Sequence, residues 1–350
     1  MKRSIFTALI FCGFGLSAQA QTCDCPENYA YVVQKLEANY AGFQDKVTPA
    51  HQAAYQKLKA RTRRKARKAK TVEACATLIK DWLTTFRDGH VYLSPQGRTS
   101  SKPAAQLTAK RPSIKRLDEN TTLLVLPSFS IKYTQAIDSL VSVYTSSPTP
   151  LLIIDIRGNG GGGDRPYFKL LPLLYTKPYE VHGVEFLATE DNRANFEQLL
   201  KQEIPSDTRK VVEELVAKMK ANQGQFVLFG EEKSIKTYEP VPYAPEQIAV
   251  IQDSKCASAA EQFLLYALQS DKVTTFGASN SKGALDYANV NELPLPGMPY
   301  LVGVPTSRST RLPETSVDSA GIAPQVKLAA DVEDVTAFVQ EQLSVIQQKQ

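Results

Sequence analysis

The chain has 350 residues, of which 43% are hydrophobic and 22% are charged. A chain of this length and composition can bury a full core, so we expect one large globular domain or two smaller ones. The 41 basic and 36 acidic residues nearly balance, which leaves no global field to attract polyanions. Nucleic acid is therefore not the expected partner.

The first 20 residues have the organisation of a secretory signal peptide. Lys2 and Arg3 precede an apolar run at 5–16, and the small-residue segment 18–20 (AQA) resembles a cleavage site. The apolar run is too short to span a bilayer, so no stable membrane insertion is expected. We predict a mature chain that begins near Gln21, secreted across the inner membrane into the bacterial periplasm or the medium.

Four cysteines remain after cleavage, in a compartment where disulfides persist. We expect Cys75 to pair with Cys23 or Cys25, which would tie the mature N-terminus to a helix. The fourth cysteine is Cys256. A metal site at Cys23 and Cys25 is disfavoured because no second pair of Cys or His lies at ligand spacing. No metal or other cofactor is expected.

The N-terminal region, residues 21–115, is predicted to be largely helical, because apolar residues recur at helical intervals over 26–87. Its basic run at 57–70 (KLKARTRRKARKAK) contains no aromatic residue that could stack on a base. We interpret this run as a solvated helix face. The alternative is that the basic run attracts an anionic surface or an anionic substrate.

The region 116–330 has the pattern of an α/β core. Continuous apolar runs are typical of strands buried on both faces, and a helical pattern between two such runs implies a right-handed crossover in one sheet. The runs are 122–127 (TLLVLP), 151–156 (LLIIDI), 247–252 (QIAVIQ) and 273–276, and the helical patterns are 131–146 and 259–269. We expect a charged, helix-rich insertion at 180–230, able to cap a site, and a closing helix within 331–350.

Ser258 is the candidate nucleophile. It follows the apolar run 247–252 and a short turn, and it stands directly before a helical pattern that begins at Ala259. A serine at that point projects from the carboxyl end of the sheet, where α/β folds place their sites. The free N–H groups of the helix start can stabilise negative charge on a reacting oxygen. The alternative is an ordinary N-cap serine.

Four consecutive glycines, 160–163, follow the apolar run 151–156. Consecutive glycines let the backbone approach a ligand and turn its N–H groups into a cavity. A phosphate-binding loop is disfavoured because neither the dinucleotide spacing nor a Walker lysine is present. We therefore interpret Gly160, Gly161 and Gly162 as candidates for one side of an oxyanion hole.

His90 is the candidate general base. The chain has three histidines, and this one alone sits in a glycine-containing turn, Asp88-Gly89-His90, flanked by apolar sequence. A lone histidine is more often structural than catalytic. If a histidine acts as a base in this chain, it is this one.

Together, four motifs resemble the core of the tail-specific (C-terminal-processing) and tricorn-core serine peptidases. They are IIDIRGNGGG at 153–162, CASAAEQFLLYAL at 256–268, FGASNSKGA at 276–284 and VDSAGIAPQV at 317–326. The resemblance covers roughly residues 71–328 and is poor over 180–230. It implies a crotonase/ClpP-like spiral α/β core. It also implies that Ser258 is the nucleophile and that the Ala259 N–H, with one glycine N–H, holds the oxyanion.

The resemblance allows two ways of activating the serine. One branch of the family uses a Ser-Lys dyad, and Lys282 lies close to where that branch keeps its base. The tricorn-like branch uses a histidine and a distant acid, which His90 and Asp318 resemble, although that branch has glutamate at the position of Asp318. No segment recognisable as a peptide-docking PDZ module lies between His90 and Thr121. This favours His90 with Asp318 over Lys282.

The sequence thus predicts a secreted serine peptidase that hydrolyses peptides or unfolded proteins through an acyl-enzyme on Ser258. His90 would carry the proton and Asp318 would orient it. Alternatives are the Lys282 dyad, a catalytically silent binding protein similar to interphotoreceptor retinoid-binding protein, and a crotonase-like acyl-CoA enzyme. Glu261, one helical turn after the serine, is assigned a capping or packing role.

Overall fold

The computed structural model describes residues 23–97, 111–329 and 331–348. The predicted signal peptide lies outside these ranges, and so does part of the stretch between His90 and Thr121. No helix in the described part of the chain is long and apolar enough to cross a membrane.

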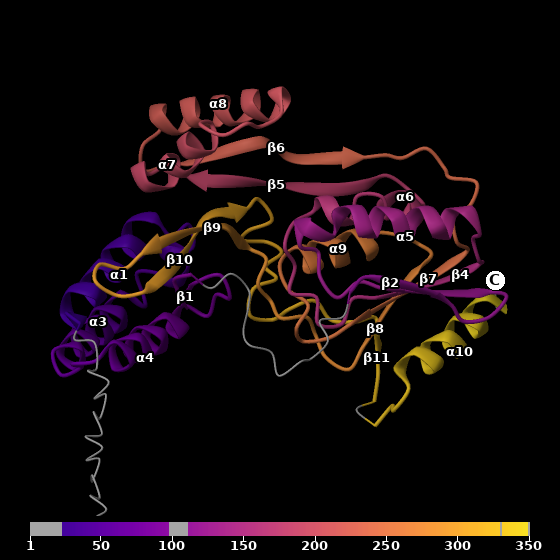
Figure 1. The fold of residues 1–350 in the computed structure, drawn as a ribbon, viewed down its shortest axis with the longest axis horizontal. Helices are drawn as coiled ribbons and strands as arrows, with labels where there is room; N and C mark the ends of the chain where they lie inside the picture. The colour runs from indigo at the N-terminus through magenta and orange to yellow at the C-terminus, as the bar shows by residue number, and fades with distance from the viewer. Residues whose placement is uncertain (1–22, 98–110, 330, 349–350) are drawn as a thin grey trace, which may run out of the picture.

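A six-stranded sheet forms the centre of the α/β part of the molecule (Figure 1). Its strands are β2 (Ser113–Arg116), β3 (Thr121–Val125), β4 (Leu151–Asp155), β7 (Gln247–Gln252), β8 (Val273–Gly277) and β11 (Val326–Lys327). The order is β11-β8-β7-β4-β3-β2, parallel throughout except where β2 pairs with β3. β4 and β7 are buried at every residue, as expected of continuous apolar runs.

Helices cover both faces of this sheet. They are η2 (Ile131–Tyr133), α5 (Thr134–Ser146), η3 (Arg165–Tyr167), α6 (Leu171–Leu174), α9 (Ala259–Ala267) and α10 (Val335–Gln348). α5, α6 and α9 pack on one face, and α10 packs on the other. The predicted strand, helix, strand unit is therefore present as β3, η2 with α5, and β4.

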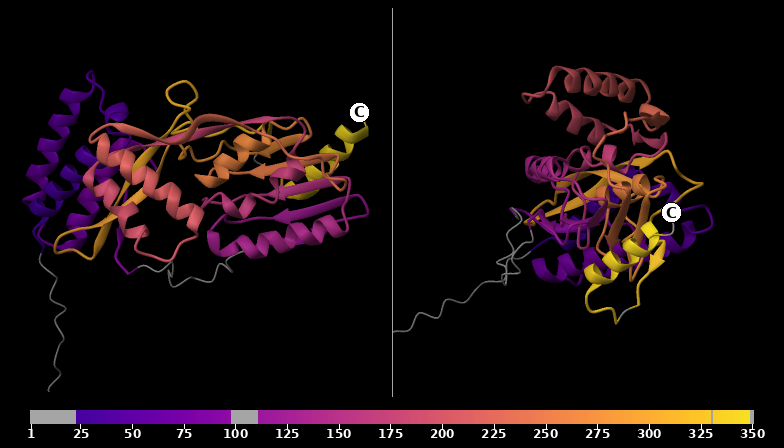
Figure 2. Two further views of the ribbon diagram at one scale, coloured as in Figure 1. Left: turned by 90° about the horizontal axis from the view of Figure 1, so that it is seen from above. Right: turned by 90° about the vertical axis from the view of Figure 1, so that its right-hand side faces the viewer.

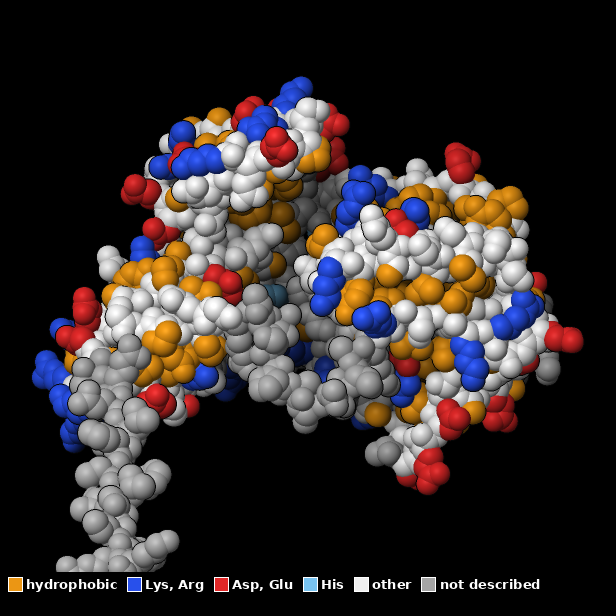
Figure 3. All heavy atoms as spheres, viewed as in Figure 1, with side chains coloured by type: hydrophobic (Ala, Val, Ile, Leu, Met, Phe, Trp, Pro, Cys, Tyr) orange, Lys and Arg blue, Asp and Glu red, His pale blue; other side chains and the backbone are white. Residues whose placement is uncertain are grey.

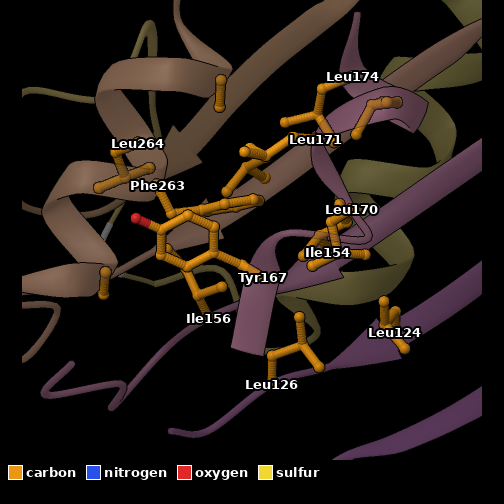
Figure 4. Packing of buried hydrophobic residues seen from close by; sticks show 14 of the residues in the cluster. Leu124, Leu126, Ile154, Ile156, Tyr167, Leu170, Leu171, Leu174, Phe263 and Leu264 are labelled. Carbon is orange, nitrogen blue, oxygen red and sulfur yellow. The ribbon is translucent and has the colours of Figure 1, made fainter. Parts of the chain in front are cut away.

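An aromatic cluster lies under the two loops that follow β4 and β7. Figure 4 shows Tyr167 beside Phe263 and Ile156. The rings of Tyr167 and Phe263 each lie near Phe129, with centroids 5.1 and 5.6 Å away. All three side chains are fully buried. Because such packing is dense and rigid, it supports both loops and holds them in place.

A second, five-stranded sheet has the order β1-β10-β5-β6, with β9 also paired to β10. Its strands are β1 (Tyr92–Pro95), β5 (Tyr179–Leu187), β6 (Phe226–Lys236), β9 (Tyr287–Pro294) and β10 (Tyr300–Ser309). The N-terminal helices pack against β1 and β10 in a separate apolar cluster that includes Trp82 and Val302. The predicted fold class, α/β with N-terminal helices, is confirmed.

The N-terminal helices are α1 (Cys25–Asn39), α2 (Phe43–Lys46), α3 (Gln52–Ala66), α4 (Val72–Leu83) and η1 (Thr84–Phe86). A disulfide joins Cys25 to Cys75 and so ties α1 to α4, which is one of the two expected pairings; Cys23 is free. The basic run on and after α3 is solvated, as interpreted from the sequence, and Figure 3 shows Lys and Arg side chains gathered at that end of the molecule.

The stretch 180–230 is helix-rich only in its middle. α7 (Glu190–Leu199) and α8 (Ser206–Ala221) are flanked by β5 and β6, which pair with each other and join the second sheet (Figure 2). The helix-rich segment expected at 180–230 is therefore present as α7 and α8, and its two ends are strands. Both strands are mostly half-buried or exposed, so neither shows the continuous apolar run that marks β4 or β7.

Candidate active site

Ser258 lies between the end of β7 and the first turn of α9, in an unusual backbone conformation. Its φ and ψ are 56° and −123°, whereas N-cap residues ordinarily lie in the β region. A positive φ is uncommon in a residue other than glycine, and such conformations cluster at functional sites. The backbone N–H of Ser258 donates to Ala284 O and to Glu261 Oε2, both at 3.0 Å. The bond to Glu261 is one half of a capping box, so it is the positive φ that separates Ser258 from a plain capping serine.

The glycine turn packs directly against the turn of Ser258. Gly161 has a φ of +89°, and a Cβ added there would lie 2.6 Å from Ala257 O and 2.9 Å from Ala259 N. Only glycine fits such an approach. The buried Asn159 fixes the turn, because its Oδ1 accepts the N–H groups of Gly161 (2.9 Å) and Phe129 (3.1 Å).

Among the candidate oxyanion donors, this arrangement distinguishes an N–H group that is already hydrogen-bonded from those that are free. The Gly161 N–H is already bound to Asn159, which disfavours Gly161 as an oxyanion donor and leaves it a packing role. For the N–H groups of Gly160, Gly162 and Ala259, the described residues offer no hydrogen-bond acceptor. These three groups are free to bind an oxygen that carries negative charge.

A cavity of about 560 Å³ brings the candidate residues together. The molecule is visibly hollowed in this region, between the N-terminal helices and the α/β part (Figure 3). Residues from both loops, from the His90 turn and from β5 and β9 line the cavity. They include Ser258, Ala259, His90, Gly160, Gly162 and His182.

His90 lies at the edge of this cavity, and its ring nitrogen Nδ1 is turned toward the protein interior. Its side chain is 18% exposed, and its Nδ1 is buried without a hydrogen-bond partner among the described residues. Burial lowers the pKa of His90; the Asp88 carboxylate opposes this shift, and the charge of Lys282 adds to it. His90 is therefore neutral at pH 7, the state that a general base requires.

Asp318 is buried close enough to Asp88 to feel its charge, with only 2% of its side chain exposed. Its Oδ1 accepts the N–H groups of Leu285 and Asp286, both at 2.8 Å. Its Oδ2 has no hydrogen-bond partner in the described part of the chain. Burial, and then the charge of Asp88, raises the pKa of Asp318 to about 7. No hydrogen bond or ion pair joins Asp318 to His90 within the described ranges.

Residues 120–328 match the family model Peptidase family S41. The chain belongs to this family. S41 enzymes are serine peptidases, so the chain is a serine-type peptidase, and the family resemblance of its motifs is confirmed.

Solved structures similar to this S41 peptidase cover almost its whole length. Mature CPAF complexed with lactacystin has a TM-score of 0.64 at 12% identity, over 93% of this chain and 98% of that chain. A putative peptidase from Parabacteroides merdae has 0.58 at 14%, over 93% and 97%. A lipoprotein from Streptococcus agalactiae has 0.55 at 15%, over 94% and 98%. These likenesses show a shared fold. No curated protein matches the chain.

In this S41 peptidase Lys282 lies beside the His90 turn. Its Nζ lies 3.3 Å from the point where a Cβ on Gly89 would be, and its side chain is exposed. Lys282 is not one of the described residues that line the cavity around Ser258. The two candidate bases thus come close to each other, but only His90 shares a cavity with the serine.

Glu261 has a larger role than the sequence analysis gave it. It caps the Ser258 N–H, as expected, but it is fully buried and also accepts hydrogen bonds from the Ser281 hydroxyl and the Gly283 and Ala284 N–H groups. It therefore joins two of the four motifs. Capping-box spacing reveals its bond to Ser258, but no sequence signal reveals the other three.

Proposed function

We propose that this S41 peptidase cleaves peptide bonds through an acyl-enzyme on Ser258, with His90 as general base. The observation that carries the proposal is the shared cavity. Ser258, His90 and the free N–H groups of Ala259 and the glycine turn all line it, which is the set of groups that acyl transfer needs.

The proposed reaction begins with a neutral His90, which takes the proton of the Ser258 hydroxyl as its oxygen attacks the substrate carbonyl. The N–H of Ala259 and that of Gly160 or Gly162 stabilise the resulting oxyanion. His90 then gives the proton to the departing amine. A water molecule, activated in the same way, releases the acid product from Ser258.

A carboxylate is proposed to orient His90 and to stabilise the imidazolium that forms. Asp318 suits this role, because its buried Oδ2 lacks a donor while the buried Nδ1 of His90 lacks an acceptor. Each of these atoms has only an ion-pair partner at 3.9 Å, Lys46 for Asp318 and Asp88 for His90. Buried polar atoms without hydrogen bonds are costly unless they meet a partner directly or through water. Aspartate in place of the longer glutamate of tricorn-like enzymes makes a bridging water the natural link.

Peptides and unfolded proteins are the proposed substrates, and an envelope compartment outside the inner membrane is the proposed location. The signal-like residues 1–20 and the disulfide between Cys25 and Cys75 support the location, because such bridges persist in oxidising compartments.

The experiment compares turnover of a mixed peptide library by the mature wild type and by Ser258→Ala, His90→Ala and Lys282→Ala. His51→Ala is the matched control, since His51 is exposed and bonds to the Thr48 hydroxyl. Loss of roughly 10⁴-fold or more in kcat is expected for the first two variants, and retention for the other two.

The reverse result for His90 and Lys282 would establish the Ser-Lys dyad. Wild-type protein that turns over no peptide and takes no label from a serine-reactive phosphonate would indicate a binding protein.

A further inference from the structure

The carboxylate that contacts His90 belongs to Asp88, which the proposed mechanism does not use. Its Oδ1 accepts the backbone N–H of His90 at 2.8 Å and lies 3.9 Å from the Nδ1 of the same residue. The Asp88 side chain has no exposed surface. A carboxylate two residues before the histidine thus fixes its backbone and lies close to the inward side of its ring, without a hydrogen bond to the ring.

We propose that Asp88 is a positioning residue for His90, and that Tyr40 and Lys46 hold Asp88 and Asp318 beside it as a buried carboxylate pair. This inference rests on the proposed role of His90 as general base. It assigns to the N-terminal helical region a direct part in building the active site.

Tyr40 fixes the second oxygen of Asp88. Its hydroxyl donates to Asp88 Oδ2 at 2.7 Å, a charge-assisted bond of the stronger kind. The Tyr40 ring is buried, with edge contacts to Phe86 and Tyr287 at centroid distances of 5.8 and 5.7 Å. With both oxygens held, the Asp88 carboxylate cannot rotate away from His90.

Lys46 supplies the counter-charge. It is the last residue of α2, and its Nζ lies 3.9 Å from Asp318 Oδ2 and 5.1 Å from the centre of the Tyr287 ring. Burial raises the pKa of Asp88, and the charge of Lys46 opposes this shift. Burial also raises the pKa of Asp318, to about 7. An imidazolium ion on His90, formed when Ser258 gives up its proton, would favour the ionised form of both carboxylates and would be stabilised by it.

The electrostatic surroundings of His90 agree with this arrangement. Among the charged groups that act on its pKa, Asp88 has the largest effect that favours the protonated ring, and Glu261 a smaller one. Lys282 acts against protonation, and the backbone of Tyr287 acts for it. Loss of the Asp88 charge is therefore expected to lower the pKa of His90.

Nitrogen NMR of the His90 imidazole tests the proposal without relying on turnover. The spectra are recorded in the Ser258→Ala protein, alone and combined with Asp88→Asn, Asp318→Asn or Tyr40→Phe. We expect Asp88→Asn to lower the His90 pKa and to change its tautomer ratio, and Tyr40→Phe to cause a smaller shift in the same direction. Asparagine at position 88 keeps an oxygen that can accept the backbone N–H of His90. Phenylalanine at position 40 keeps the packing of the aromatic ring, so both variants should fold.

Asp45→Asn is the matched control. Asp45 lies beside Lys46 but bonds to the Tyr287 hydroxyl and pairs with Arg308, so its loss should leave the His90 signals unchanged. In the otherwise wild-type enzyme, Asp88→Asn should lower kcat by roughly 10²-fold or more with little change in KM, and Asp88→Glu should restore part of the loss.

The proposal is overturned if Asp88→Asn leaves the His90 pKa and tautomer ratio unchanged, whether or not Asp318→Asn shifts them. Failure of the phosphonate to label Ser258 in wild-type protein would instead count against the proposed function. The two failures are therefore distinguishable.

Discussion

The carboxylate of Glu261 accepts the backbone N–H of Ser258 at 3.0 Å. The same Oε2 accepts the Ala284 N–H at 2.9 Å, and Oε1 accepts the Ser281 hydroxyl and the Gly283 N–H. A single buried side chain thus fixes the strained serine turn against the segment that carries Lys282. The position of Ser258 depends on this carboxylate as much as on the start of α9.

Glu261→Gln should therefore destabilise the protein and slow catalysis. The amide replaces one acceptor oxygen by a donor, which leaves at least one buried N–H or hydroxyl group unpaired at a cost of roughly 1–3 kcal/mol. We expect the free energy of unfolding, measured with urea, to fall by that amount or more. The exposed Glu213 on α8 gives the control Glu213→Gln, which should change it by less than about 0.5 kcal/mol. Equal stability of the two variants would refute the role given to Glu261.

Local sequence patterns predicted the parts of this fold that depend on local chemistry. β4 and β7 were predictable because strands buried on both faces need continuous apolar residues. β5 and β6 were not, because the pairing of β5 with β10 and of β6 with β5 stabilises strands that lack such a run.

The same contrast between local patterns and long-range contacts holds in the candidate active site. Ser258 and the glycine turn carry motifs, whereas the bond from Tyr40 to Asp88 joins residues 48 positions apart. Periodicity and spacing do not encode such a contact, since it depends on how the end of α1 packs against η1 and the turn that follows it. The charge environment of His90 was for this reason beyond the reach of sequence analysis.

Gly161→Ala should disrupt the packing of the two site loops. The added methyl group would lie 2.6 Å from Ala257 O at a φ of +89°, so the backbone must shift, and we expect a loss of roughly 1–3 kcal/mol in the free energy of unfolding. Gly160→Ala is the matched control for stability, because a Cβ there meets nothing within 4 Å. Thermal or urea unfolding measures both. A Gly161 variant as stable as the Gly160 variant would show that the loops do not depend on this contact.

Asp318 should make the protein less stable as the pH rises through neutrality. Its pKa is about 7 in the folded state and about 3.9 when unfolded, so the folded protein binds this proton more tightly. The resulting stability is fully present below pH 4 and is lost as the pH rises through 7. Asp318→Asn removes the titration. We therefore expect the variant to lose less free energy of unfolding than the wild type between pH 5 and pH 8.

Urea unfolding at the two pH values measures this difference. Asp207→Asn, at an exposed position of α8, should follow the wild type. If the free energy of unfolding of Asp318→Asn and of wild type changes equally with pH, Asp318 is ionised throughout this range. If Asp318→Asn loses more free energy of unfolding than the wild type, the effect of Asp318 has the opposite sign to the one expected.

Breaking the disulfide between Cys25 and Cys75 should reduce activity before it unfolds the α/β part. The bridge closes a loop of 50 residues, and loop-closure entropy gives it a stabilising effect of up to about 4 kcal/mol. The loop contains Tyr40 and Lys46, whose contacts hold Asp88 and Asp318. The double variant Cys25→Ser with Cys75→Ser should therefore lose peptidase activity at urea concentrations where most of the circular dichroism signal of the protein is still native.

Cys23→Ser removes a free cysteine and serves as the control. Coincident loss of activity and secondary structure in the double variant would show that the N-terminal helices and the α/β part unfold as one unit, with no separate weakening of the site.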